Sequence, residues 1–326
     1  MNAGPRIQAL IPARKAESGF PDNPASPSYG LNHRETLFSM SNDTFEFEYP
    51  RVLSIAGSDS GGGAGIQADL KTFAALGCYG MTAITALTAQ NTQGVRAIHG
   101  VPPAMLRDQI DAVVEDIGVD AVKIGMLHSP EIVLAVAEAI DRHALDKIVL
   151  DPVMVATSGA VLIDNPAIDV LVRELFPRAV LVTPNLDEAA LLVGRPLNNA
   201  DDMESAAHEL LGKGARAVLL KGGHLPGDTV MDLLLTASGE RHWMHAPRIH
   251  SANTHGTGCT LSSAIAAGLA LGQPLLEAVE MARAYVRAAL LAGAKVKTGS
   301  GSGPLNHGHA PLAMRLKPLN PLKPRG

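Results

Sequence analysis

The sequence predicts an α/β protein in which a central, mostly parallel sheet lies between helices, in three layers. First, short apolar runs alternate with helical patterns along the chain, as repeated strand-helix-strand units do. Second, 46% of the residues are hydrophobic but only 3% are aromatic, which suits buried parallel strands under closely packed helices. Third, polar residues follow several apolar runs directly, at the edge where open α/β sheets place their ligands.

Composition and charge argue against several classes of protein. The formal net charge is -5 and the pI is near 6.2, so a nucleic-acid-binding surface is not expected. No apolar run reaches the roughly 18 residues that cross a bilayer, so no membrane partner is expected. The cysteines, Cys78 and Cys259, form no Cys-x-x-Cys motif, which favours a reducing cytoplasm over a disulfide-stapled fold or a zinc site.

The chain divides into one domain and two terminal segments. Residues 1–48 are rich in Pro, Ser and Asn and show no sustained periodicity, so we expect a disordered extension. Residues 49–310 contain no linker and form a single domain. Residues 311–326 carry several basic side chains and are expected to be a solvated tail.

The first unit of the domain is a strand, a glycine loop and a helix. Residues 51–56 are apolar, the loop 57–65 is glycine-rich, and residues 66–76 show a helical pattern. Ile66 stands where the last glycine of Gly-x-Gly-x-x-Gly belongs, and no Gly-Lys-Ser/Thr follows. The loop therefore fits neither a dinucleotide-binding fingerprint nor a P-loop.

The same alternation continues to the end of the domain. Strands are predicted at 81–87, 121–124, 147–150, 179–182 and 217–220, and a hairpin over 229–246 turns at Ser238 and Gly239. Helices are predicted at 103–117, from Pro130 after a Ser129 cap, after Asn185, and at 260–271 and 275–292. We expect the polar residues that follow the strands to meet at one sheet edge.

Residues 253–264 (NTHGTGCTLSSA) place two glycines where an apolar helix begins. The start of a helix leaves backbone N–H groups without intrahelical partners and carries a partial positive charge, so an anion can bind there. Phosphate is the obvious candidate. A tight loop before a buried helix is the alternative interpretation of this stretch.

A site assembled from the strand ends would hold Asp69, Gln90, Asp151, Asn185, Glu188, Lys221 and Cys259. Carboxylates suit Mg²⁺, a lysine suits phosphate, and a helix start suits a transferring phosphoryl group, which together indicate a kinase without a P-loop. Each residue also has a structural explanation. Asp69 fits an exposed helix acid, Asp151 a turn before Pro152, Lys221 a strand end, and Asn185 with Glu188 a capping box.

Cys259 has two interpretations. A free cysteine usually behaves as an inert, buried hydrophobe. In the first turn of a helix, however, its thiolate would be stabilised, which favours a reactive role. The histidines at 242, 245, 250 and 255 span a hairpin and a loop without cysteines at ligand spacing, so they do not indicate a metal site.

Seven segments, in order along the chain, closely resemble the hydroxymethylpyrimidine/phosphomethylpyrimidine kinases of thiamine biosynthesis. They are 56–72 (AGSDSGGGAGIQADLKT), 88–92 (TAQNT), 123–127 (KIGML), 150–154 (LDPVM), 183–189 (TPNLDEA), 221–224 (KGGH) and 253–259 (NTHGTGC). The resemblance implies a ribokinase-like fold and a homodimer. It also implies that ATP phosphorylates the hydroxymethyl group of 4-amino-5-hydroxymethyl-2-methylpyrimidine and then phosphorylates the monophosphate.

The same resemblance implies a role for each matching residue. Gln90 would hydrogen-bond the pyrimidine, Asp69 and Gly57 would line its pocket, and Val153 would pack on the ring. Asp151 and Glu188 would act through Mg²⁺ and water, with Asn185 and Lys221 near the phosphates of ATP. Gly256, Thr257, Gly258 and Cys259 would form the anion hole.

Other functions stay open at this point. A pyridoxal or pyridoxine kinase of the same fold shares the cysteine at position 259. A non-catalytic pyrimidine-binding module would not need the set formed by Asp151, Glu188, Lys221 and Cys259. A nicotinamide-dependent dehydrogenase is disfavoured by the missing dinucleotide fingerprint.

Overall fold

The computed structural model describes residues 45–155, 159, 162–163 and 165–319. The predictions of disorder for residues 1–44 and of a tail over 320–326 lie outside these residues. Within the described part, none of the helices is long and apolar enough to cross a membrane.

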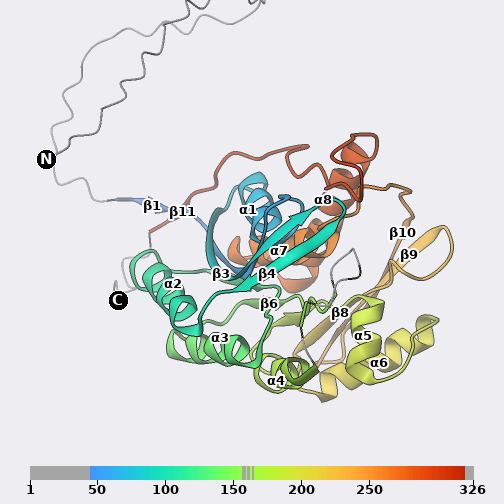
Figure 1. The fold of residues 1–326 in the computed structure, drawn as a ribbon, viewed down its shortest axis with the longest axis horizontal. Helices are drawn as coiled ribbons and strands as arrows, with labels where there is room; N and C mark the ends of the chain where they lie inside the picture. Colours follow the sequence, from blue (N-terminus) through green and yellow to red (C-terminus); the bar gives the residue numbers. More distant parts are fainter. Residues whose placement is uncertain (1–44, 156–158, 160–161, 164, 320–326) are drawn as a thin grey trace, which may run out of the picture. The chain divides into compact units, whose positions relative to one another are not determined.

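The described chain is built on a nine-stranded sheet with the order β10-β9-β8-β7-β6-β5-β2-β3-β4 (Figure 1). Its strands are β2 (Arg51–Asp59), β3 (Tyr79–Asn91), β4 (Gly94–Gly100), β5 (Ala121–Ile124), β6 (Ile148–Leu150), β7 (Leu181–Val182), β8 (Ala217–Lys221), β9 (Thr229–Thr236) and β10 (Arg241–Pro247). The strands from β3 to β8 in this order pair in parallel, whereas β4 at one edge and β9 and β10 at the other are antiparallel. The predicted mostly parallel sheet is confirmed.

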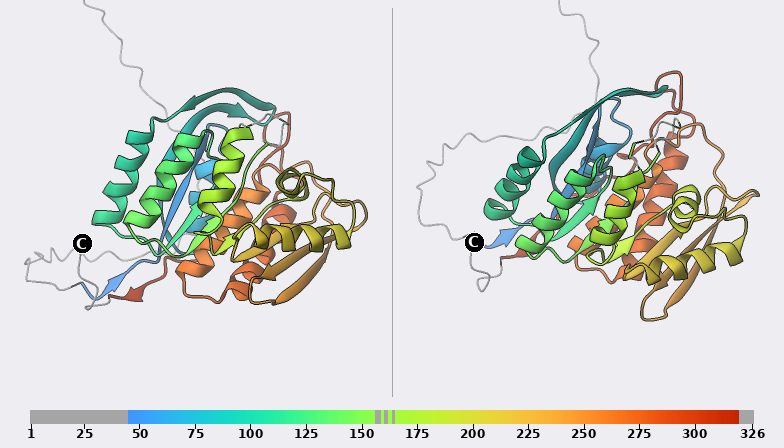
Figure 2. Two further views of the ribbon diagram at one scale, coloured as in Figure 1. Left: turned by 90° about the horizontal axis from the view of Figure 1, so that it is seen from below. Right: turned by 60° about the horizontal axis from the view of Figure 1, so that its bottom comes forward.

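Helices cover both faces of the sheet (Figure 2). One face carries α1 (Gly65–Ala75), α7 (Thr257–Ala270) and α8 (Leu275–Gly293), and the other carries α2 (Pro103–Asp116), α3 (Pro130–Arg142), α4 (Asn165–Leu175), α5 (Leu186–Val193) and α6 (Ala200–Gly212). Side chains of a strand alternate between the two apolar cores. Ile148 and Leu150 of β6 join the core on the second face, and Val149 joins the core under α7. Both faces are buried, as parallel sheets require.

Helix α7 lies in the middle of its layer. Every residue from Thr260 to Ala270 is buried, and most of these side chains are small. A helix that is apolar on all sides is held by its surroundings rather than by one face. The first turn of α7, which contains Cys259, is therefore fixed relative to the strand ends.

Several elements were not predicted from the sequence. The strand expected at 81–87 is longer in the structure, where β3 continues to Asn91 and turns directly into the edge strand β4. Strand β4 is largely exposed and lacks the apolar run that identifies a strand. Helices α4 and α6 were also not identified.

The two ends of the described chain lie together. Strand β1 (Phe47–Glu48) pairs with β11 (Lys317–Pro318), and Leu312 N and Arg315 N donate to carbonyls at the end of α1. Lys317 Nζ lies 2.6 Å from Asp120 Oδ1 and 3.1 Å from Glu48 Oε1. Residues 45–48 and 311–319 are therefore attached to the domain, although we expected an extension and a solvated tail.

Candidate active site

A cavity of about 670 Å³ opens at the carboxyl ends of the parallel strands. Its lining includes every site residue predicted from the sequence except Asp69: Gly57, Gln90, Asp151, Val153, Asn185, Glu188, Lys221, Gly256, Thr257, Gly258 and Cys259. These residues therefore meet at the edge of the sheet where we expected them, which is the usual ligand position in open α/β sheets.

The two glycine loops touch each other in the cavity wall. Gly256 is the N-cap of α7 with φ of 85°, and a Cβ on it would lie 1.9 Å from the carbonyl oxygen of Gly63. A Cβ on Gly258 would lie 3.2 Å from Lys221 Nζ and 3.7 Å from Asp151 Oδ2. The glycines therefore keep a space open between the start of α7, a lysine and a carboxylate, which is the setting an anion with a bound cation needs.

Asp151 follows β6 and is almost fully buried. Its Oδ1 accepts hydrogen bonds from Lys221 Nζ and Thr183 Oγ1, both at 3.1 Å, and its Oδ2 accepts one from Ser262 Oγ at 3.3 Å. Burial by itself would raise the pKa of Asp151, but the charges of Lys221 and Lys123 bring that pKa below its usual value. Asp151 is therefore a carboxylate at neutral pH.

Glu188 and Asn185 form the capping box at the start of α5. Asn185 N donates to Glu188 Oε2 at 2.8 Å, and Glu188 N donates to Asn185 Oδ1 at 2.9 Å. Both residues also line the cavity, so the capping box does not exclude a role in the site. Burial raises the pKa of Glu188 to about 7, with Lys221 opposing the shift and Asp151 adding to it. The buried pair of carboxylates is thus short of positive charge.

Cys259 corrects one expectation. Burial raises the pKa of the Cys259 thiol to about 11; Lys123 opposes this shift, whereas Asp151 and Asp69 reinforce it. We expected the helix start to stabilise a thiolate, but desolvation and two nearby carboxylates prevail. Cys259 is a protonated thiol at neutral pH.

Asp69 lies behind the cavity rather than in its wall. Its side chain is fully buried, and its oxygens accept hydrogen bonds from Ser54 Oγ at 2.5 Å, Ser263 Oγ at 2.6 Å and Lys123 Nζ at 3.0 Å. The carboxylate thus joins α1, β2, β5 and α7 beneath Cys259. We expected Asp69 to line the pyrimidine pocket, but in the structure it is occupied by this internal network.

Lys123 is a residue of the cavity wall that sequence reasoning did not assign. Burial disfavours its charge, but the Asp69 carboxylate raises the pKa of Lys123 above its usual value, so the side chain stays cationic. The signal was present: a lysine inside the four-residue strand β5, all of which is buried, requires an internal anion.

Asp59 and His255 connect the first glycine loop to Gln90. Asp59 accepts hydrogen bonds from the amides of Gly61, Gly63 and Ala64, and His255 Nε2 lies 2.9 Å from Asp59 Oδ2.

Burial by itself would raise the pKa of Asp59, but these hydrogen bonds bring that pKa below its usual value. His255 Nε2 also lies 3.4 Å from the side-chain amide of Gln90. The Gln90 amide thus lies beside the buried His255–Asp59 pair.

The far end of the cavity is apolar with a basic rim. Val230, Ile249, Val286 and Leu290 contribute the apolar side chains, and Arg248, Arg283 and Arg287 the basic ones. No sequence motif identifies this end, because its residues come from β9, the loop after β10, and α8, without a shared pattern.

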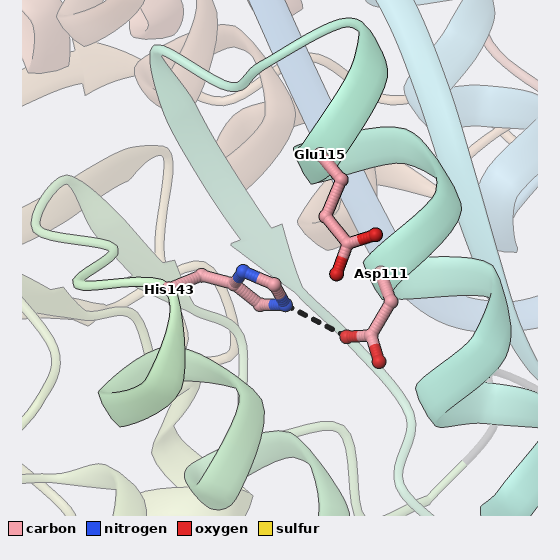
Figure 3. Close-up of side chains that lie close together, drawn as sticks. All are labelled: Asp111, Glu115 and His143. Carbon is pink, nitrogen blue, oxygen red and sulfur yellow. Dashed lines mark hydrogen bonds and ion pairs between the residues drawn. The ribbon is translucent and has the colours of Figure 1, made fainter. Parts of the chain in front are cut away.

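A separate group of two acids and a histidine, drawn in Figure 3, does not belong to the cavity lining. Asp111 and Glu115 of α2 face His143 at the end of α3, and their ligand atoms lie within 4.8 Å of one another. His143 Nε2 is 2.7 Å from Asp111 Oδ1, and Arg142 forms an ion pair with the same carboxylate. Since Asp111 already pairs with Arg142 and contacts His143, we interpret the group as a contact between α2 and α3.

The chain also matches known proteins over most of its length. The phosphomethylpyrimidine kinase family matches residues 59–306. A hydroxymethylpyrimidine/phosphomethylpyrimidine kinase of Rhizobium meliloti is 52% identical over 79% of this chain and 97% of its own length. A thiamine biosynthesis bifunctional protein, ThiED, of Geobacter sulfurreducens is 53% identical over 79% of this chain, which spans 53% of that longer protein.

Two solved structures share the fold. The phosphomethylpyrimidine kinase of Clostridium difficile is 45% identical, with a TM-score of 0.64 over 73% of this chain and 97% of that chain. A pyridoxal kinase of Bacillus subtilis in complex with ADP is 35% identical, with a TM-score of 0.74 over 80% of this chain and 98% of that chain. The fold and site define a kinase of the ribokinase-like class. Within this class, the chain belongs to the phosphomethylpyrimidine kinase family.

Proposed function

We propose that the protein uses ATP to phosphorylate the hydroxymethyl group of 4-amino-5-hydroxymethyl-2-methylpyrimidine and then the resulting monophosphate, in thiamine biosynthesis. The observation that carries this proposal is that one cavity holds both predicted binding regions. Gln90 lies near one glycine loop, and Cys259 lies in the first turn of α7. Lys221 and Asp151 lie beside Gly258. Family membership and the matching relatives support it.

The two substrates would occupy opposite ends of the cavity. The pyrimidine would lie between Gly57, Gln90 and Val153, with its hydroxymethyl oxygen toward Cys259. The nucleotide would place its base at the apolar end near Val286 and its phosphates near Lys221. The transferring phosphoryl group would then face the backbone amides at the start of α7.

The donor set also fits Mg²⁺. Asp151 and Glu188 offer oxygen ligands, and burial together with the Asp151 carboxylate raises the pKa of Glu188. Gly258 leaves space beside Asp151 and Lys221. When bound through these carboxylates and water, Mg²⁺ would neutralise phosphate charge. Asp151 and Glu188 are the residues that would hold it.

Phosphoryl transfer at this site depends mainly on positioning. The hydroxymethyl oxygen would form a bond to the γ-phosphorus while the bond to ADP breaks, and the hydroxyl proton would pass to the transferred phosphoryl group late in a loose transition state. A strong base is therefore not required, which agrees with the high pKa of the Cys259 thiol. Cys259 would orient the attacking hydroxyl, and Lys221 and the α7 amides would stabilise the charge on the phosphoryl oxygens.

The proposal is tested by measuring ADP release with each pyrimidine in the presence of ATP and Mg²⁺, with pyridoxal as a competing substrate. We expect the pyrimidine and its monophosphate to be converted, and we expect Cys259→Ala to fold like the wild type but to lose most of its turnover. Failure to convert the monophosphate would contradict the second reaction. A tenfold preference for pyridoxal in kcat/KM would favour a pyridoxal kinase instead.

A homodimer and a cytoplasmic location stay predictions from the sequence.

A further inference from the structure

The side-chain amide of Gln90 has two polar neighbours, and their chemistry determines which way the amide faces. Thr88 Oγ1 lies 3.1 Å from Gln90 Oε1 and 2.9 Å from the carbonyl oxygen of Ser58. On the other side, His255 Nε2 lies 3.4 Å from Gln90 Nε2 and 2.9 Å from Asp59 Oδ2. The oxygen and nitrogen of an amide are told apart only by such partners.

The histidine side requires an acceptor. The Asp59 carboxylate can only accept, so His255 Nε2 must carry a proton that points to Asp59, whichever form the ring takes. The Gln90 amide lies beside this N–H group. An amide N–H₂ group placed there would bring two hydrogen-bond donors together. An amide oxygen there could instead accept a second, shared hydrogen bond from the His255 N–H.

The threonine side requires a donor. The Ser58 carbonyl has no proton, so the single hydroxyl proton of Thr88 is directed to it, and the hydroxyl offers a lone pair to Gln90. An amide oxygen there would compete for a proton already in use. The N–H₂ group of Gln90 supplies the missing donor.

Both neighbours thus demand the same orientation. We infer that Thr88 and the His255–Asp59 pair hold the Gln90 amide with its oxygen toward His255 and its nitrogen toward Thr88, and that this fixed polarity selects a 4-aminopyrimidine over a 4-oxopyrimidine. The inference rests on the proposed function, in which Gln90 reads the edge of the pyrimidine.

The selection follows from the pattern of donors and acceptors. A 4-aminopyrimidine presents an amino donor next to a ring-nitrogen acceptor, which matches the free lone pair and free N–H of the amide. A 4-oxo ring presents the reverse pattern, an acceptor next to a ring N–H. A freely turning glutamine could bind either ring, but a held glutamine leaves the 4-oxo ring with two mismatched pairs, and such mismatches discriminate strongly.

The kinetic test compares 4-amino- and 4-oxo-5-hydroxymethyl-2-methylpyrimidine as substrates of the wild type, Thr88→Val and Thr88→Ser. We expect the wild type to prefer the 4-amino ring by about 100-fold or more in kcat/KM. Thr88→Val removes the hydroxyl acceptor while keeping the shape, and should lower this preference by about fivefold or more, mainly through KM. Thr88→Ser keeps the hydroxyl and should keep the preference.

A preference in Thr88→Val within twofold of the wild type would overturn the inference, as would equal losses in Thr88→Val and Thr88→Ser. Nuclear Overhauser effects provide a second test, because they do not need turnover. In the free protein, the Gln90 side-chain amide protons should lie close to the Thr88 methyl group, and proximity to the His255 ring protons instead would contradict the orientation.

The two tests separate this inference from the proposed function. If the wild type phosphorylates neither pyrimidine, the proposed function is refuted. The nuclear Overhauser effects of the Gln90 amide protons would still determine the orientation of the amide. A wild type that phosphorylates the 4-amino ring but shows no effect of Thr88→Val would leave the function intact and refute the selection.

Discussion

At the scale of single residues, several site residues have two roles, and the sequence could indicate only one at a time. Asn185 and Glu188 were recognisable both as a capping box and as cavity residues, and the structure contains both arrangements. Asp69 was recognisable as a motif residue, but its burial against Lys123 depends on how α1, β5 and α7 pack. Such a contact joins positions 54 residues apart, which no local pattern reveals.

Glu188 gives a prediction about stability and pH. Its pKa is about 7 in the folded protein against an ordinary value of 4.5, so the folded state binds the proton more tightly. Stability from this group is present below about pH 4.5 and is lost as the pH rises through 7. Glu188→Gln removes the ionisable group, so it should stabilise the protein more at pH 8 than at pH 4.5. We expect the change in the free energy of unfolding caused by this substitution to be more favourable at pH 8 by on the order of 2 kcal/mol.

Urea unfolding of both proteins at the two pH values measures this difference. Asp187→Asn is the matched control, because the neighbouring Asp187 side chain is 77% exposed. A Glu188→Gln effect that is equal at both pH values, or that has the opposite sign, would show that the carboxylate is not destabilised by burial.

At the scale of elements, regular strand-helix units were predictable and the irregular ones were not. Parallel strands such as β5 and β8 are short apolar runs with polar residues after them, so their period and position were clear. Strand β4 is an exposed edge strand without such a pattern. The glycine loop before α7 was predicted as an anion site, but its contact with Gly63 joins two distant loops and required the fold.

The glycines at the start of α7 give a matched pair of predictions. Gly256→Ala would place a Cβ 1.9 Å from the Gly63 oxygen at a φ of 85°, so it should lower the free energy of unfolding by about 3 kcal/mol or more. Gly258→Ala lies inside the helix without a positive φ and should change stability by less than about 1 kcal/mol. Its methyl group, 3.2 Å from Lys221 Nζ, should nevertheless lower kcat by about tenfold or more.

Denaturant unfolding and steady-state kinetics separate the two effects. A stable and fully active Gly258→Ala variant would mean that the phosphoryl group does not pass beside Lys221. A Gly256→Ala variant as stable as the wild type would mean that the two loops separate at little cost.

At the scale of the whole described chain, the ends are part of the structure on the side of the sheet away from the cavity. Residues 312–319 hydrogen-bond to the end of α1 and to β1, and Lys317 pairs with Asp120 just before β5. These contacts lie at the amino ends of the parallel strands, whereas the cavity lies at the carboxyl ends. The sequence around Lys317 has no apolar period, so its attachment could not be predicted.

Removal of residues 311–326 should therefore affect stability without affecting the site. We expect the Tm to fall by about 2–6 °C, because several backbone hydrogen bonds and a half-buried ion pair are lost. The KM for both substrates should stay within twofold of the wild-type values. Differential scanning calorimetry measures the change in Tm, and steady-state kinetics measure the KM values. Removal of residues 320–326 alone is the control. A rise in KM after removal of 311–326 would mean that residues 311–319 contribute to the site.

The contact between Gly63 and Gly256 also has a thermodynamic consequence. One loop borders the proposed pyrimidine end of the cavity and the other begins α7, the proposed anion-binding helix, and no atom could be inserted between them. A displacement of either loop must then be taken up by the other. Occupation of the two ends of the cavity would be linked, so that each ligand changes the affinity for the other by the same factor.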